Sequence, residues 1–513
     1  MTTENLQVMP ANSVGCDPLR PELKQHDGVF AWISLALGYL FVKFVFSDAN
    51  GFAETGITIS TFICGAVYVK LCGKKITVSQ WMMGAMICLF SLMFSISANR
   101  FLNTLCFWFI TAAQFWWVQA VCIQARFVTK FFLPDLMRTV FIQPLRDLGG
   151  MFRAGFISLR SGRRSGAIKA VVIGLTVTIP LTLAVALLLS EADDNIDNML
   201  MKFLNILSRQ QLLHEIIIAL FAVPTGMIIF GMLRADAKQK LYPLPSDIYY
   251  TEKASHLKKL DNLGIYAGVT PICVLYLIYI ISQTNYFLSA FFRKLPEGMN
   301  YARYARSGFF ELCMIAVINL AVILFMLTFS KKSGSESTKP LTFFTCMICG
   351  FTLFIIATAV AKMLLYVDAY GLTLLRLYTT WFMVLLGIVF ITLAIRAFVK
   401  KLPTAKILSA SFIVMFSILC FSRPDALIAE YNISRYEAGT LDELDVEMLC
   451  RRSDDAYAVM LDHRDAISRA GYSAVFDTNL SYLLDSYESF PASAMNYSAQ
   501  KILSECGERG RFA

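Results

Sequence analysis

Charged residues are scarce in this chain of 513 residues. Asp, Glu, Lys and Arg together make up 16% of the sequence, apolar residues make up 57%, and the mean hydropathy is +0.58. A soluble protein or a disordered regulator of this length would carry more charge. Long apolar stretches instead recur between residues 29 and 422, separated by short polar gaps. The composition therefore predicts an all-α fold, built as a polytopic bundle of transmembrane helices.

Catalytic signatures are also missing. Only four histidines occur, none of them with HExxH spacing, and no GxSxG, GxxxxGK[ST] or GxGxxG pattern is present. The sequence thus predicts no catalytic, cofactor-binding or metal site, and an enzyme is disfavoured. Most of the thirteen cysteines lie in apolar stretches, where a thiol packs as a small apolar group. Cys450 and Cys506 lie beyond those stretches, and a disulfide between them stays open.

A removable signal peptide and an internal repeat are two further absences. Residues 1–28 are polar and of mixed charge, so we expect the first apolar stretch itself to direct insertion. The missing repeat, with an odd number of spans, argues against the inverted duplication typical of many secondary transporters.

Windows of about 20 apolar residues predict eleven membrane spans. They are 29–47, 55–71, 79–97, 101–123, 169–190, 213–233, 262–284, 307–329, 341–364, 375–395 and 404–422.

Lys and Arg are distributed unevenly between the connections. The amino terminus and every second loop after it hold 27 basic residues, whereas the alternate loops hold 7. Because cytoplasmic loops carry the positive excess, we expect the amino terminus to be cytoplasmic and the carboxyl terminus to be external. The tail from residue 423 holds 9 basic and 16 acidic residues, as suits a translocated segment. The net charge of +9 thus reflects topology, and no nucleic-acid partner is predicted.

Three regions follow from this topology: a polar cytoplasmic tail at 1–28, a transmembrane helical domain at 29–422 and an external α-helical domain at 423–513. Three to five short helices are expected in the last region. Pro424 suits a first helical turn and Gly439 a helix stop, and Thr440 with Glu443 predicts a capping box.

The cytoplasmic connection at 129–169 interleaves aromatic and basic residues, which is typical of a helix lying in the headgroup region. The arginines expected to meet anionic lipid at the cytoplasmic face are Arg138, Arg146, Arg153, Arg160, Arg163 and Arg164. Either a general membrane-surface contact or a lipid-specific regulatory site fits this pattern.

Three short motifs occur in order along the chain. The first is the LPEGMNYARYARSGFFEL run within and after the external loop at 283–307, the second is YGLTLLR from Tyr370, and the third is NISRYEAGTLD from Asn432. Their characteristic residues are Leu295, Pro296, Glu297, Gly298, Tyr301 and Tyr304, then Tyr370, Gly371 and Thr373, then Asn432, Arg435 and Tyr436.

Together the motifs resemble domain-of-unknown-function family 4173, which is related to family 4153. The resemblance spans roughly residues 170–465 and departs from the family pattern at Arg303 and after Asp442. It implies a multi-pass protein of the bacterial plasma membrane and supplies no activity.

Charges within or beside spans are a further signal, because Lys, Arg or Asp at mid-bilayer costs roughly 2.5–3.5 kcal/mol. Lys362, Asp368 and Arg376 surround the hairpin between the ninth and tenth spans. We expect Asp368 to pair with Arg376 or Lys362, and Glu311 to join through Arg303 or Arg306. This cluster is either a structural clamp or a site for an ion or anionic solute.

Two functions remain open. The first is a permease-like or channel-like protein whose charged cluster lines a polar pathway through the lipid bilayer. The alternative is an envelope sensor or assembly partner that binds a protein through the external loop and the C-terminal domain. A membrane enzyme is a third and weaker hypothesis.

Overall fold

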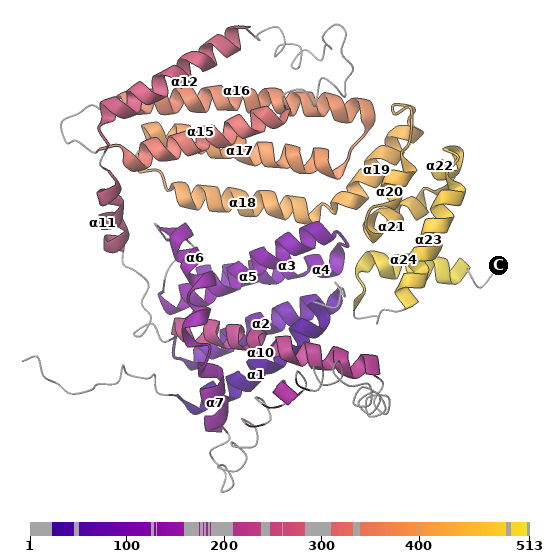
Figure 1. Cartoon of the computed structure of the whole chain (residues 1–513). Helices are drawn as coiled ribbons and strands as arrows, with labels where there is room; N and C mark the ends of the chain where they lie inside the picture. Colours follow the sequence, from indigo (N-terminus) through magenta and orange to yellow (C-terminus); the bar gives the residue numbers. More distant parts are fainter. Residues whose placement is uncertain are drawn as a thin grey trace, which may run out of the picture. The chain divides into compact units, whose positions relative to one another are not determined.

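The computed structural model describes residues 23–45, 51–124, 128–129, 131–158, 209–237, 247–258, 260–282, 309–331, 339–399, 401–488 and 494–509, with five single positions between 174 and 185. Apart from one isolated bridge between Leu260 and Ser330, the regular structure of these residues is helical, which confirms the all-α prediction. The helices form two compact units, which are described separately (Figure 1).

Ten membrane-spanning candidates occur among the described helices, judged by their length and apolar composition. They are His26–Phe44, Phe52–Leu71, Val78–Ile96, Arg100–Cys122, His214–Arg234, Asn262–Ser282, Glu311–Phe329, Lys339–Tyr370, Leu374–Phe398 and Thr404–Phe421. Each corresponds to one of the eleven predicted spans. The remaining predicted span, 169–190, lies outside the described residues except for single positions, and the loop at 283–307 lies wholly outside them.

The first unit comprises residues 1–42, 64–74 and 141–243. It holds α1 (Gln25–Val45, to residue 42), the last part of α2 (Phe52–Leu71), the 3₁₀ helix Pro144–Asp147, α7 (Gly150–Ser158) and α10 (Arg209–Ala237). Helices α1 and α10 touch at glycines, since a Cβ on Gly38 would lie 2.6 Å from the Ala222 carbonyl oxygen. Small residues permit such close helix contacts inside membranes.

A buried group of charges lies in this unit. Arg234, at 1% exposure, donates to the Asp147 carboxylate, and Arg153 Nη2 contacts Asp147 Oδ1 at 3.1 Å. The Tyr68 hydroxyl donates to buried Asp27 at 2.9 Å. Pairing offsets the cost of removing these groups from water.

The second unit comprises residues 43–63, 75–140 and 244–513. Its amino-terminal helices are the first part of α2, α3 (Val78–Ser91), α4 (Met93–Ile96), α5 (Arg100–Cys122) and α6 (Phe132–Phe141, to residue 140). Helices α3 and α5 pack together, and the Trp117 indole donates to the Gln80 carbonyl at 2.7 Å.

The same unit continues with α11 (Asp247–Leu257), α12 (Asn262–Ser282), α15 (Phe309–Phe329), α16 (Lys339–Tyr370), α17 (Leu374–Phe398) and α18 (Thr404–Phe421). Helices α12, α15, α16 and α17 share one apolar core, and α16, α17 and α18 follow one another side by side (Figure 1). A polar chain crosses this core, where Tyr276 donates to Asn319 and Asn319 donates to Thr352.

In the part of the tail that the structure describes, six α-helices follow the last span: α19 (Pro424–Glu437), α20 (Val446–Cys450), α21 (Asp454–Asp462), α22 (Arg464–Arg469), α23 (Ser473–Glu488) and α24 (Tyr497–Arg509). They surround an apolar core that includes Ile433, Leu449, Met460, Phe476 and Ile502. This is one helix more than the three to five predicted from the sequence.

Local signals in this tail are confirmed in part. Pro424 stands at the first position of α19, and Gly439 follows that helix with a φ of +66°. The predicted capping box is wrong, because residues 441–445 are not helical. Helix α20 starts later, where the Asp445 side chain accepts from the Met448 amide at 2.8 Å. Cys450 and Cys506 are both free thiols.

Candidate functional site

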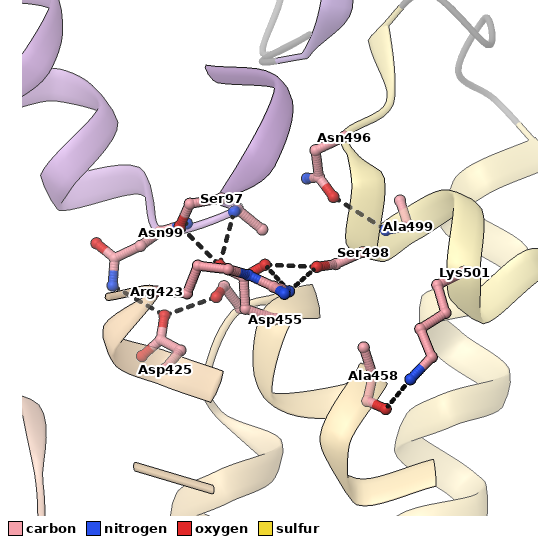
Figure 2. Close-up of polar contacts among 12 residues, drawn as sticks. Ser97, Asn99, Arg423, Asp425, Asp455, Ala458, Asn496, Ser498, Ala499 and Lys501 are labelled. Carbon is pink, nitrogen blue, oxygen red and sulfur yellow. Dashed lines mark hydrogen bonds and ion pairs between the residues drawn. The ribbon is translucent and has the colours of Figure 1, made fainter. Parts of the chain in front are cut away.

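Asp455 lies in the first turn of α21 and is fully buried. Its Oδ2 accepts hydrogen bonds from the Ser97 hydroxyl at 2.6 Å and the Ala98 amide at 3.0 Å. Its Oδ1 accepts from the Ser498 hydroxyl at 2.5 Å and from Arg423 Nη2 at 3.0 Å (Figure 2). Four donors, one of which is the ion-paired Arg423, offset the cost of burying the charge. One carboxylate therefore joins α21 and α24 to the turn between α4 and α5.

Arg423 reaches Asp455 through an unusual backbone conformation. Its φ is +48°, in the left-handed region, and it directly precedes Pro424. A proline disfavours the right-handed helical conformation in the residue before it, and the left-handed one costs roughly 1–2 kcal/mol. The turn directs the guanidinium back to Asp455 and to the Ser498 hydroxyl, 2.5 Å away. This strain lies where the last span, α18, joins the tail.

Asp425 forms a second buried contact between the tail and a span. Its Oδ2 accepts from the Asn99 side-chain amide at 2.8 Å and the Ser453 hydroxyl at 2.6 Å (Figure 2). Asn99 is also the amino-terminal cap of α5, accepting from the Leu102 amide at 2.9 Å. The start of α5 is thus fixed to α19 through Asn99, and Asp425 in turn binds Ser453, which directly precedes α21.

Asn432 of α19 holds the hairpin between α16 and α17. Its Oδ1 accepts from the Leu372 amide at 2.7 Å, and its Nδ2 donates to the Leu372 carbonyl at 2.9 Å. Arg435, one turn later, donates to the Asp368 carbonyl at 2.9 Å and to the Thr440 carbonyl at 2.8 Å. Gly371 has a φ of +75°, and a Cβ there would lie 2.5 Å from Asn432 Oδ1. Only glycine fits this contact without displacement.

We call the contacts of Asp455, Arg423, Asp425 and Asn432 with one another's helices, with the α4–α5 turn and with the α16–α17 hairpin the polar junction. A cavity of about 480 Å³ lies beside it. The cavity is lined by residues 98–101, Leu374, Asp425, residues 451–454 and residues of α23, α24 and the segment before α24.

Two titratable groups of the tail line this cavity. Burial raises the pKa of the Asp454 carboxyl above its usual value of 3.8, because the charged form loses solvation. Burial, together with the nearby Asp454 charge, also raises the pKa of the Tyr487 hydroxyl.

The family model for a domain of unknown function, DUF4153, matches residues 84–463. The chain belongs to the DUF4153 family. No curated protein and no solved structure matches it. The matched range contains Ser97, Asn99, Asp425 and Asp455, so most of the polar junction lies within it, whereas Ser498 lies beyond it.

Two of the three predicted motifs of this DUF4153 protein meet in space. Asn432 of the third motif binds the backbone of the second at Leu372, and Arg435 binds the Asp368 carbonyl, two residues before the second motif. Thr373 caps α17 as predicted, accepting from the Arg376 amide at 3.4 Å. Tyr436 packs against the tail core. Residues 295–304 of the first motif lie outside the described residues.

The structure describes only some residues of the predicted charge cluster. Arg376 donates to the Tyr370 and Gly371 carbonyls, and its guanidinium lies 3.8 Å from the Tyr366 ring centroid. Among the described residues no ion pair joins Arg376 to Asp368, and the Arg376 Nη1 is directed to the hairpin carbonyls instead. Asp368 and Glu311 are exposed, Lys362 is 1% exposed within α16, and Arg303 and Arg306 lie outside the described residues.

The structure also describes only some of the arginines that were predicted to meet lipid. Arg138 and Arg146 are half-buried, and Arg153 is partly engaged by Asp147. Arg160, Arg163 and Arg164 lie outside the described residues. Helix α6 exposes an apolar stripe at i, i+4 and i+8, formed by Leu133, Met137 and Phe141. The interfacial interpretation of this segment stays a prediction.

The central residues of the junction are not among the predicted site residues. No sequence pattern assigns a role to Asp455, and Arg423 is predicted only as the first residue of the tail. A usable signal was present, since Asn99 and Arg100 open a span and Arg423 and Asp425 flank a proline directly after one. No cluster of three metal-ligating side chains occurs in the described part of the chain.

Proposed function

We propose that this integral membrane protein is an envelope sensor or assembly partner, in which the state of the C-terminal helices is transmitted to the spans through the polar junction. The contact of Asp455 with Ser97 and Ala98 carries the proposal, because a buried carboxylate of the tail holds the turn between two spanning segments. Buried hydrogen bonds such as these are cooperative, so movement of a tail helix would break them together and release the turn.

The proposed topology has a cytoplasmic amino terminus and an external tail in the bacterial plasma membrane. The tail contacts span ends at Phe52, at Ser97 and Asn99, and at Leu372. All three segments belong to the loops that are poor in Lys and Arg, which supports an external tail. Motif resemblance supports the finer relationship to family 4173 and the bacterial location.

A parity argument supports the span proposed at 169–190. Helix α5 starts beside the tail, so it ends at the opposite side. Helix α16 ends beside the tail, so it starts at the opposite side, where α15 ends. The start of α12 lies at this opposite side too, because the Ser330 hydroxyl, just after α15, donates to Asn262 at 2.6 Å. In this topology the chain would cross the membrane an even number of times between Cys122 and Asn262, and the span candidate in α10 would be one of these crossings. We propose that the predicted span at 169–190, which lies outside the described residues, is the other.

A polar pathway is the second candidate, favoured by the buried Lys362 in α16 and by the Tyr276, Asn319 and Thr352 chain. Polar groups inside a bundle mark solute or ion pathways in many membrane proteins. In this permease-like interpretation Glu311, Asp368 and Arg376 would line its outer mouth, and Arg303 and Arg306, which lie outside the described residues, stay predicted members of the cluster.

The membrane-surface role proposed for 129–169 rests on α6. Its exposed apolar stripe would insert among acyl chains at the cytoplasmic face, while Arg138 and its neighbours meet anionic headgroups.

Hydrogen exchange tests the proposed transmission. We expect an antibody fragment raised against α23 to alter amide exchange at residues 97–103 and 367–373 in the intact protein. In Asp455→Asn the response at 97–103 should be lost, because the acceptor for Ser97 and Ala98 is weakened and the charge on Arg423 is left unpaired.

Asp477→Asn is the matched control, since Asp477 is a half-exposed tail carboxylate paired with Arg464. It should respond like the wild type. A fragment that binds the tail and leaves exchange at 97–103 unchanged in the wild type would contradict the proposal.

A further inference from the structure

Two buried polar atoms, on residues that line the cavity beside the polar junction, have no hydrogen bond to any described residue. They are Asp425 Oδ1 and Arg452 Nε. Asp425 is 2% exposed. Tyr487, which lines the same cavity, is 7% exposed, and its hydroxyl interacts with Asp454. Buried polar groups in native proteins are nearly always satisfied, so two unsatisfied atoms on one cavity indicate something that binds there.

The charged residues that line the cavity favour an anionic ligand. Arg100, Arg451 and Arg452 all line it, and planar guanidinium groups bind phosphate through paired hydrogen bonds. Of the two lining carboxylates, Asp425 already accepts from Asn99 and Ser453 through one oxygen. The other carboxylate is Asp454, and burial raises the pKa of its carboxyl.

The other polar groups of the cavity, on Asp425 and Tyr487, favour hydroxyl groups on the ligand. Asp425 Oδ1 can only accept, while the Tyr487 hydroxyl can donate and accept. A bare phosphate offers no donor to that carboxylate, whereas a polyol attached to the phosphate does. The cavity, at about 480 Å³, is large enough for a group of this size.

We infer that this cavity binds a polyol phosphate, with the phosphate at Arg100, Arg451 and Arg452 and the hydroxyls at Asp425 and Tyr487. The inference deepens the proposed function, on which it rests, by naming what the sensing tail recognises. The cavity includes the first residues of the span Arg100–Cys122, and Phe101 there is 56% exposed. The same chemistry is available from the headgroup of phosphatidylglycerol or from free glycerol phosphate.

Binding measurements on the full chain test the inference. The chain is placed in phosphatidylcholine nanodiscs and titrated with glycerol phosphate by calorimetry, and in parallel its retention of phosphatidylglycerol against phosphatidylcholine is measured by native mass spectrometry. Saturable binding of free glycerol phosphate supports a soluble ligand, and selective retention of phosphatidylglycerol alone supports the lipid.

Two variants locate the site. Arg452→Gln should weaken binding at least tenfold, and Tyr487→Phe, which removes only the hydroxyl and keeps the buried ring, should weaken it severalfold. Arg469→Gln is the control, because Arg469 is an exposed tail arginine outside the cavity. Unchanged binding in both cavity variants, or no selective binding in either assay, would overturn the inference. The exchange response to the antibody fragment uses no ligand, so it separates failure of this inference from failure of the proposed transmission.

Discussion

At the scale of single residues, the protein uses neighbouring carboxylates in opposite ways. Asp455 accepts four hydrogen bonds and faces Arg423, so its buried charge is compensated. Asp454, the preceding residue, lines the cavity and has a raised pKa caused by desolvation. Two adjacent residues of one helix turn thus differ in role: Asp455 anchors the structure, whereas the pKa of Asp454 depends on its burial.

Asp454 makes the stability of the protein depend on pH. A carboxyl whose folded pKa is raised binds more protons in the folded than in the unfolded state, so stability falls as pH rises through the interval between the two pKa values. We expect Asp454→Asn to be more stable than the wild type at pH 8, with the difference shrinking toward pH 4.5. Thermal unfolding at both pH values measures this.

Asp485→Asn is the control for this measurement, because Asp485 is exposed on α23. Its effect should be small at both pH values. A wild type that gains stability over Asp454→Asn as the pH rises would contradict the assignment.

At the scale of elements, the α16–α17 hairpin depends on Gly371. An alanine there would adopt an unfavourable positive φ and would also meet Asn432 Oδ1. We expect Gly371→Ala to lower the free energy of unfolding by about 1–3 kcal/mol. The measurement is denaturant unfolding in detergent.

Gly439→Ala is the matched variant. Gly439 has a φ of +66°, but a Cβ there has open space around it. The difference between the two variants therefore isolates the contact with Asn432 from backbone strain. Equal losses would mean that the hairpin does not need this contact.

Short-range signals made several elements predictable. Gly371 and Thr373 mark a helix stop and a cap through local chemistry, and the apolar windows locate ten of the described helices within a few residues. The helix-start signal at Thr440 failed, because Thr440 instead closes the end of α19 through Arg435.

The polar junction was not predictable in this way. Ser97 and Asp455 are 358 positions apart, and no local pattern reports that they meet. The expected pairing of Asp368 with Arg376 rested on closeness in sequence, whereas backbone carbonyls released at the hairpin compete for the same guanidinium.

At the scale of the whole molecule, the proposed direction of sensing depends on the side of the membrane on which the tail lies. The tail contacts three loops that are poor in basic residues, and the opposite connections carry most of the Lys and Arg. An external tail would expose the cavity and the polar junction to the envelope, whereas a cytoplasmic tail would reverse the direction of sensing.

Cysteine labelling in intact cells tests this most directly. In a cysteine-free background, one variant carries Tyr482→Cys on the exposed face of α23 and another carries Lys75→Cys in the opposite loop. We predict that a membrane-impermeant maleimide labels position 482 in intact cells and position 75 only after permeabilisation. Labelling of position 75 in intact cells, with position 482 protected until permeabilisation, would contradict the account.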